Sequence, residues 1–315
     1  MKNKTRYNLL IILVISVCLL YVFYGMTGNN ASYLFYRRIP RLLAMILVSI
    51  AITISTSIFQ TITNNRLLTP DLLGYSQLYI LLQTFIVFAF GGLHLLNINP
   101  YLNFIAITVL MVMFSLVIFS YILKKSNHYV YLLLLIGMIL NTLFSSISSF
   151  LQMVIDPNEF SIIQNNVIAS FNTINTNVIY IAVLILLLPL PWVIKNLHNF
   201  DVLLLGEDYA KNLSVDTNKL YTSSLIVISI LTSLSTALVG PIVFLGMLVV
   251  NIARIWSKSY QHKEFIKTAI CLSIILTVGG QFIIDKVFNF SVTLSVLLNL
   301  IGGLYMIYLI MKERT

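Results

Sequence analysis

Side chains able to perform covalent or metal chemistry are few in this sequence, and they lie far apart. No His-Glu-x-x-His pair occurs, and no pair of carboxylates stands beside any histidine. We therefore expect each histidine to be interfacial or solvated rather than a metal ligand or a catalytic base. The histidines are His94, His128, His198 and His262.

A phosphate-binding loop of the form Gly-x-x-x-x-Gly-Lys-Ser/Thr is also missing from the sequence. The chain is therefore not expected to hydrolyse ATP, and a nucleotide-driven cycle would require another subunit. The sequence predicts a protein that is not an enzyme and that itself binds no cofactor and no metal.

Polar side chains within long apolar segments are the next candidates for function. Burying them in lipid is unfavourable, so they should face the interior of a helix bundle or a wet cavity. We expect them either to join helices or to line a translocation path. They are Gln60, Gln83, Asn141, Gln152, Gln281, Asp285 and Asn299.

The most charged stretch of the chain, residues 196–217, contains a short amphipathic pattern at 203–213. Leu205, Tyr209 and Leu213 recur every four residues and would share one face of a helix. Charged residues lie on the other faces. This pattern predicts either a plain connecting helix at the membrane surface or a docking surface for a partner on the same side.

The composition places these residues in an integral membrane protein. Of the 315 residues 59% are hydrophobic and 9% are charged, and the mean hydropathy of +0.95 exceeds what a soluble core requires. Long continuous apolar runs favour helices over the alternating strands of a barrel. The net charge of +9 comes from short loops and forms no continuous stripe, so nucleic acid is not an expected partner.

Ten apolar runs predict about ten transmembrane helices in a single all-α transmembrane domain, residues 1–315. The third and eighth runs are short or interrupted, so they should be tilted, broken or partly re-entrant. The predicted crossings are 8–26, 41–62, 72–90, 101–123, 129–152, 178–196, 218–238, 242–257, 265–284 and 293–311.

The distribution of basic residues predicts cytoplasmic N- and C-termini, with residues 1–7 inside. Of the 19 Lys and Arg, this orientation leaves Arg37, Arg38, Arg41 and Lys286 outside and therefore the other fifteen inside. The loop 153–177 is then extracellular, where it should carry a short surface helix. The loop 196–217 is cytoplasmic.

Pro and Gly interrupt an apolar stretch in each half of the chain, which suggests an internal inverted repeat. In the first half they lie within Asn65–Gly74, and in the second within Val239–Gly246.

Several motifs, read in order, resemble the permeases of ABC importers for iron chelates (siderophores) and vitamin B12, the FecCD-like family. A basic-Ile-Pro-Arg opening is followed by Gln60, by an Asn-x-Leu-x-x-Pro-x-x-Leu-Gly segment and by a Gly-Pro-Ile-x-Phe-x-Gly segment. The matching stretches are Arg38–Arg41, Asn65–Gly74, Leu205–Ser214, Gly240–Arg254 and Ile301–Gly303. The chain departs from the family at some positions, with Arg66 where Pro is usual, Leu68 for Ala, Ser214 for Gly, Val250-Asn251 for Pro-His and Thr293 where Pro is common.

The resemblance implies a type II ABC importer permease in the cytoplasmic membrane. It would pair with a second permease, identical or homologous, and with two cytoplasmic ATPases that use ATP. An extracellular binding protein would deliver a ferric siderophore, or alternatively heme or cobalamin. The alternative function is that of an ion-coupled secondary transporter, which would be driven by an ion gradient rather than by ATP.

The resemblance also implies roles for individual residues. Arg38 and Arg41, helped by Arg37 and Lys286, would meet carboxylates of the binding protein; anchoring to lipid headgroups is the alternative. The segment 203–213 would couple to the ATPase. Its residues are Leu205, Gly206, Glu207, Asp208, Tyr209, Ala210 and Leu213. Candidates for the translocation path or for helix packing are Gln60, Asn141, Gln152 and Asn299.

Overall fold

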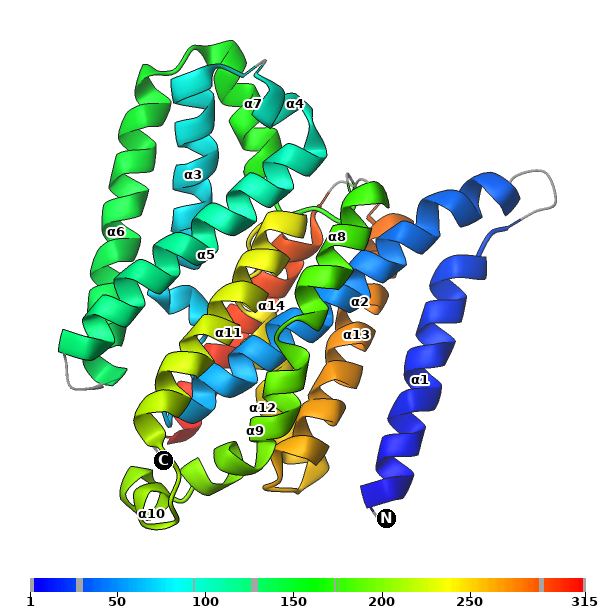
Figure 1. The fold of residues 1–315 in the computed structure, drawn as a ribbon. Helices are drawn as coiled ribbons and strands as arrows, with labels where there is room; N and C mark the ends of the chain where they lie inside the picture. The colour runs from blue at the N-terminus through cyan, green and yellow to red at the C-terminus, as the bar shows by residue number, and fades with distance from the viewer. Residues whose placement is uncertain are drawn as a thin grey trace.

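The computed structural model describes residues 3–26, 31–92, 94–125, 130–172, 174, 176–288 and 292–313. Within these ranges every regular element is helical, which confirms the predicted all-α class (Figure 1). All of the predicted site residues lie within these ranges. His128 and the first two residues of the predicted cytoplasmic N-terminus lie outside them. The elements are α1 (Asn3–Phe23), α2 (Ala31–Ile62), η1 (Pro70–Leu73), α3 (Tyr75–Phe90), α4 (Leu95–Ile98), α5 (Pro100–Lys125), α6 (Val130–Val154), α7 (Pro157–Val167), α8 (Thr176–Leu187), α9 (Leu190–Leu203), α10 (Glu207–Asn212), α11 (Thr217–Val239), α12 (Leu245–Ser257), α13 (His262–Lys286) and α14 (Leu294–Glu313).

Ten apolar helical segments of the described chain coincide with the ten predicted crossings. Seven are long and apolar enough to cross a bilayer, namely α1, α2, α5, α6, the joined α8 and α9, α11 and α13. The shorter apolar helices α3, α12 and α14 make up the rest. With 16 and 13 residues, α3 and α12 are the third and eighth segments, which were predicted to be short.

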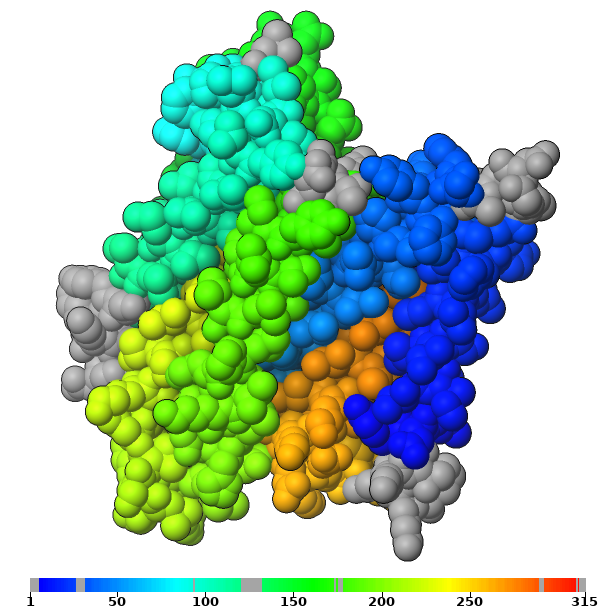
Figure 2. Space-filling model, turned by 45° about the vertical axis from the view of Figure 1, so that its right-hand side comes forward, coloured from blue at the N-terminus to red at the C-terminus, as the bar shows by residue number. Residues whose placement is uncertain are grey.

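Helix α2 forms the centre of the bundle. In its most apolar window 78% of the residues are buried, compared with 17% in α1 and 22% in α6. Small side chains let neighbouring helices approach closely; Gly246 of α12 lies so near Thr56 that any added Cβ would overlap that side chain. Figure 2 shows α8 and α9 lying across α2, with α1 against α13.

The prediction that the second crossing begins at residue 41 is wrong, because α2 already begins at Ala31. Pro40 lies inside the helix rather than before it. Proline lacks the N–H for one backbone hydrogen bond of a helix, yet α2 continues through Pro40 to Ile62. Arg38 and Arg41 are consequently helical residues of α2.

Both ends of the described chain lie at the same end of the bundle as α10 (Figure 1). We call this end the α10 end and the other the outer end. At the outer end, α7 occupies the loop 153–177, where the sequence predicts a short surface helix. Asp156 caps it by accepting a bond from the Asn158 amide at 3.0 Å, and Pro157 occupies the first turn, where its missing N–H costs nothing.

Candidate functional site

Three large apolar side chains project into solvent around α10. Leu205, Tyr209 and Leu213 are 62%, 66% and 59% exposed. We call these three residues the knob. Their common exposure at one end of the bundle is compatible with a docking surface.

The continuous helix predicted over 203–213 is wrong. Helix α9 ends at Leu203, and Gly206 then adopts φ +113°, a conformation that side chains with a Cβ rarely tolerate, so α10 covers only Glu207–Asn212. Leu205 lies in the turn between the helices. Ala210 is fully buried, so it packs against the body of the protein rather than at the knob surface.

Ionic and hydrogen bonds stiffen the segment that carries the knob. Glu207 forms an ion pair with Lys211 at 2.8 Å and accepts a bond from the Tyr221 hydroxyl of α11 at 3.4 Å. Asp216 caps α11 and pairs with Lys219 at 2.9 Å, and this hydrogen bond holds the pKa of the Asp216 carboxyl below its usual value. The remaining predicted coupling residue, Asp208, is exposed.

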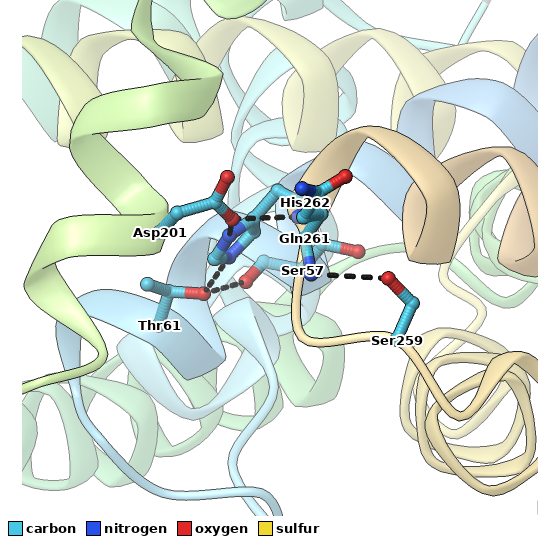
Figure 3. A network of polar contacts seen from close by, with 6 residues as sticks. All are labelled: Ser57, Thr61, Asp201, Ser259, Gln261 and His262. Atoms are coloured by element: carbon cyan, nitrogen blue, oxygen red, sulfur yellow. Dashed lines mark hydrogen bonds and ion pairs between the residues drawn. The ribbon is translucent and has the colours of Figure 1, made fainter.

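A buried polar network ties α9 to the centre of the bundle (Figure 3). The Asp201 carboxylate of α9 accepts bonds from the backbone N–H of His262 at 2.6 Å and from its Nδ1 at 2.7 Å. His262 Nε2 lies 2.8 Å from the Thr61 hydroxyl of α2, which in turn lies 2.8 Å from the Ser57 carbonyl. We call Asp201, His262 and Thr61 the tie.

The tie corrects one sequence expectation. His262 was predicted to be interfacial or solvated, but its side chain is fully buried and packs between the rings of Phe200 and Phe265. Asp201 and His262 are 61 positions apart, so no local spacing could have revealed the pair. A buried imidazole is stable here because both ring nitrogens have partners.

At the outer end, two of the predicted docking arginines have partners within the chain. Arg38 Nη1 donates to the carbonyls of Val22 at 2.7 Å and Tyr24 at 2.8 Å, where α1 ends. Arg41 is only 6% exposed and donates to the Asn172 carbonyl at 2.9 Å. These contacts give both residues a structural role, because they hold the end of α1 and Asn172 against α2.

The other two predicted docking residues remain accessible. Arg37 is exposed and has one long bond, 3.4 Å, to the Tyr33 hydroxyl. Lys286 is exposed with its Nζ 5.3 Å from the centre of the Tyr24 ring. Of the four predicted residues, these two are the exposed ones.

Two of the polar residues predicted for the path or for packing make contacts within the bundle. Gln60 is 2% exposed and donates to the Arg66 carbonyl at 2.7 Å. Gln152 of α6 donates to the Thr84 hydroxyl of α3 at 3.1 Å. Both therefore join elements of the chain.

Asn141 and Asn299, the other two residues predicted for the path or for packing, have different surroundings. Asn141 is half-buried, and its backbone approaches Gly74 so closely that a Cβ there would lie 3.3 Å from the Asn141 nitrogen. Asn299 has a buried Oδ1 without a hydrogen-bond partner among the described residues.

A cavity of about 530 Å³ opens near the outer end between α3, α5, α7, α8 and α11. Its polar lining consists mainly of carboxamides and hydroxyls, several of which pair with each other: Gln83 Nε2 donates to Asn103 at 3.0 Å, and the Tyr79 hydroxyl donates to the Asn166 carbonyl at 2.7 Å. Such groups can hold polar atoms of a ligand without strongly binding a transition metal.

Two known proteins resemble this chain in sequence along nearly its whole length. The petrobactin import system permease protein YclO of Bacillus subtilis (strain 168) is 49% identical over 314 residues, covering 100% of this chain and 99% of that protein. The petrobactin import system permease protein FatC of Bacillus anthracis is 30% identical over 321 residues, covering 99% and 91%.

A solved structure, described as an inward-facing conformation of a metal-chelate type ABC transporter, has the same fold. Its TM-score is 0.82 at 21% sequence identity, with 99% of this chain and 100% of that chain covered. The family model of the FecCD transport family matches residues 7–312. The chain is a multi-pass membrane protein and belongs to the FecCD transport family.

Proposed function

We propose that this chain is the permease subunit of an ATP-driven importer that moves a ferric siderophore across the cytoplasmic membrane, with ferric petrobactin as the first candidate. The end-to-end identity of 49% with a petrobactin import permease carries the proposal. Both termini and α10 would lie in the cytoplasm, as the excess of basic residues in the inner loops predicts.

The permease would work with a second permease, identical or homologous, two ATPases and an extracellular binding protein. The exposed knob supports an ATPase partner, because Leu205, Tyr209 and Leu213 are otherwise costly to leave in water. The exposed charges of Arg37 and Lys286 support docking of an acidic partner at the outer end.

Motion of the knob would reach the bundle through α9. The tie connects α9 to α13 and to α2, whose inner part is almost completely buried. Closure of the ATPases would therefore tilt α2 and α13 as rigid bodies rather than only bend a surface loop. Tyr209 and its neighbours receive the force, and Asp201, His262 and Thr61 transmit it.

The proposed substrate suits the outer cavity. A siderophore already supplies all ligands to its iron, so the permease needs neutral polar groups that bind the chelator without extracting the metal. Gln83, Asn103 and Asn166 provide such groups.

Uptake of labelled substrates tests the proposal: radioactive iron labels the siderophore and heme, and radioactive cobalt labels cobalamin. Cells lacking this chain should lose uptake of ferric petrobactin and regain it when the chain is restored, while uptake of heme and cobalamin stays unchanged. If heme or cobalamin uptake follows the chain instead, the substrate assignment is wrong. Uptake that is abolished by an uncoupler yet persists without any ATPase would favour the ion-coupled alternative.

A further inference from the structure

A second cavity, of about 440 Å³, lies at the α10 end and is lined by three cations. Arg66 follows α2, Arg254 belongs to the last turn of α12, and Lys258 follows α12. The rest of the lining includes Ser259 and Tyr260. We call Arg66, Arg254 and Lys258, with this cavity, the cationic pocket.

The charges of the cationic pocket are not compensated within the described chain. None of its three cations takes part in an ion pair there. Arg254 lies with its guanidinium carbon 4.7 Å from the centre of the Phe265 ring, and its buried Nε has no hydrogen-bond partner among the described residues. The nearby Asp201 carboxylate is already engaged by His262.

The backbone at the cationic pocket is fixed in place. The Arg66 carbonyl accepts bonds from Gln60 Nε2 of α2 at 2.7 Å and from Asn251 Nδ2 of α12 at 3.0 Å. Two buried carboxamides from different helices therefore set the position from which Arg66 extends toward Arg254.

Three like charges around one partly desolvated cavity repel each other, and an anion between them converts that repulsion into attraction. Guanidinium groups match the oxygens of a phosphate with two parallel donors, and the hydroxyls of Ser259 and Tyr260 can supply further hydrogen bonds. A phosphate group is therefore the anion whose shape and charge suit this donor set.

The surroundings of the pocket indicate where that phosphate comes from. Ile255, Trp256 and Tyr260 are 68%, 41% and 90% exposed beside it, at the end of an apolar helix. Exposed aromatic and apolar side chains next to cations are typical of the headgroup level of a bilayer. Basic pockets between transmembrane helices at this level bind anionic headgroups. Ser259 lies on the loop that leads into His262, so an occupant would contact the segment next to the tie (Figure 3).

We propose that the cationic pocket binds the phosphate of an anionic membrane phospholipid. The site is separate from the translocation function proposed above and does not depend on the transported substrate. Arg254 would hold the phosphate with its fork, and Arg66 and Lys258 would supply the charge that selects an anionic headgroup over a zwitterionic one.

Lipid titration of the purified permease, followed by native mass spectrometry, tests the proposal. Wild type should bind phosphatidylglycerol more tightly than phosphatidylcholine. The variant R66Q/K258Q should bind phosphatidylglycerol at least about tenfold more weakly, with phosphatidylcholine unchanged, because each basic residue near a bilayer surface contributes about fivefold. Both side chains are exposed, so this variant should fold.

The control variant K195Q/K219Q removes the same net charge from exposed positions outside the cationic pocket and should bind both lipids like wild type. The variant R254K, which keeps the charge but loses the fork, should lie between wild type and R66Q/K258Q. Equal loss in R66Q/K258Q and K195Q/K219Q, or no loss in either, would overturn the proposal. Complete displacement of phosphatidylglycerol by equimolar inorganic phosphate would also overturn it, because the pocket would then select free phosphate rather than a lipid.

Discussion

His262 shows how one buried residue can connect distant parts of this protein. Its ring nitrogens bridge Asp201 on α9 and Thr61 on α2, and its backbone N–H adds a second bond to Asp201. Since unpaired polar groups are costly in the interior, the three residues stabilise one arrangement of their helices and disfavour others. The tie is therefore a structural contact that joins three helices, and it is the route for force in the function proposed above.

Replacing Asp201 by Asn should destabilise the permease by about 1.5–3 kcal/mol, because a charged acceptor of two N–H bonds is lost in a mostly buried site. Thermal unfolding in detergent measures this effect. In the reconstituted importer, ATP hydrolysis should continue while transport per ATP falls. The matched control is Asp208→Asn, which changes an exposed carboxylate on α10. An unchanged midpoint for Asp201→Asn would contradict the role of the tie.

The outer arginines should separate into two classes when they are changed. Arg41→Ala should lower the thermal midpoint, since the Asn172 carbonyl loses its buried donor. The double change Arg37→Glu with Lys286→Glu should leave the midpoint unchanged but slow association of the binding protein by about tenfold at low salt. Surface plasmon resonance measures that rate. Equal association rates for wild type and the double variant at low salt would remove the docking role.

At the level of elements, the break between α9 and α10 decides how the knob is presented. Gly206 turns the chain at φ +113°, so Leu205, Tyr209 and Leu213 extend from a turn and a six-residue helix rather than along one continuous helix face. Ala210 packs inward, and α10 is thereby fixed to the bundle while its apolar residues stay exposed.

Tyr209→Ala should weaken binding of the ATPase by about 2 kcal/mol, the scale of an aromatic anchor in an interface. The isolated permease should keep its thermal midpoint, because the side chain is 66% exposed. Leu203→Ser is the contrasting variant. Leu203 is only 6% exposed, so this substitution should lower the thermal midpoint of the permease. Co-purification with the ATPase measures binding. Full retention of the ATPase by Tyr209→Ala would exclude the knob as its docking surface.

On the scale of the whole molecule, burial is concentrated in α2 and α11, with 78% and 67% of the residues in their apolar spans buried, whereas only 17% and 22% are buried in α1 and α6. Exposed apolar helix faces are compatible with lipid, so exposure alone does not distinguish a lipid-facing helix from one that contacts a second permease. The central position of α2 also explains why its serines and threonines from Ser49 to Thr61 are buried: Ser49 lies 2.9 Å from Thr277 of α13.

The purified chain alone in vesicles should move no ferric siderophore, because the proposed engine lies on separate subunits. Addition of the second permease, the ATPases and the binding protein should produce uptake that requires ATP hydrolysis. Iron retained inside the vesicles is the measurement. Transport by the chain alone, down or against a gradient, would contradict the proposed division of labour.

The sequence by itself determined the features that depend on local composition. Ten apolar runs predicted ten helical segments at nearly their observed places, because a stretch long and apolar enough to cross a bilayer must satisfy its backbone within itself. The motifs from Arg38 to Gly303 also indicated the family from the sequence alone, because a motif is recognised by the order and spacing of its residues along the chain.

Only the tertiary structure decided which polar residues are buried and with whom they pair. The sequence predicted an interfacial or solvated His262 and an Arg41 on the outside, but contacts with residues 61 and 131 positions away bury them both. The family resemblance placed Ala210 among the residues that couple to the ATPase, whereas packing turns it inward. Burial depends on which helices become neighbours, and that choice is made by close packing between segments far apart in the chain.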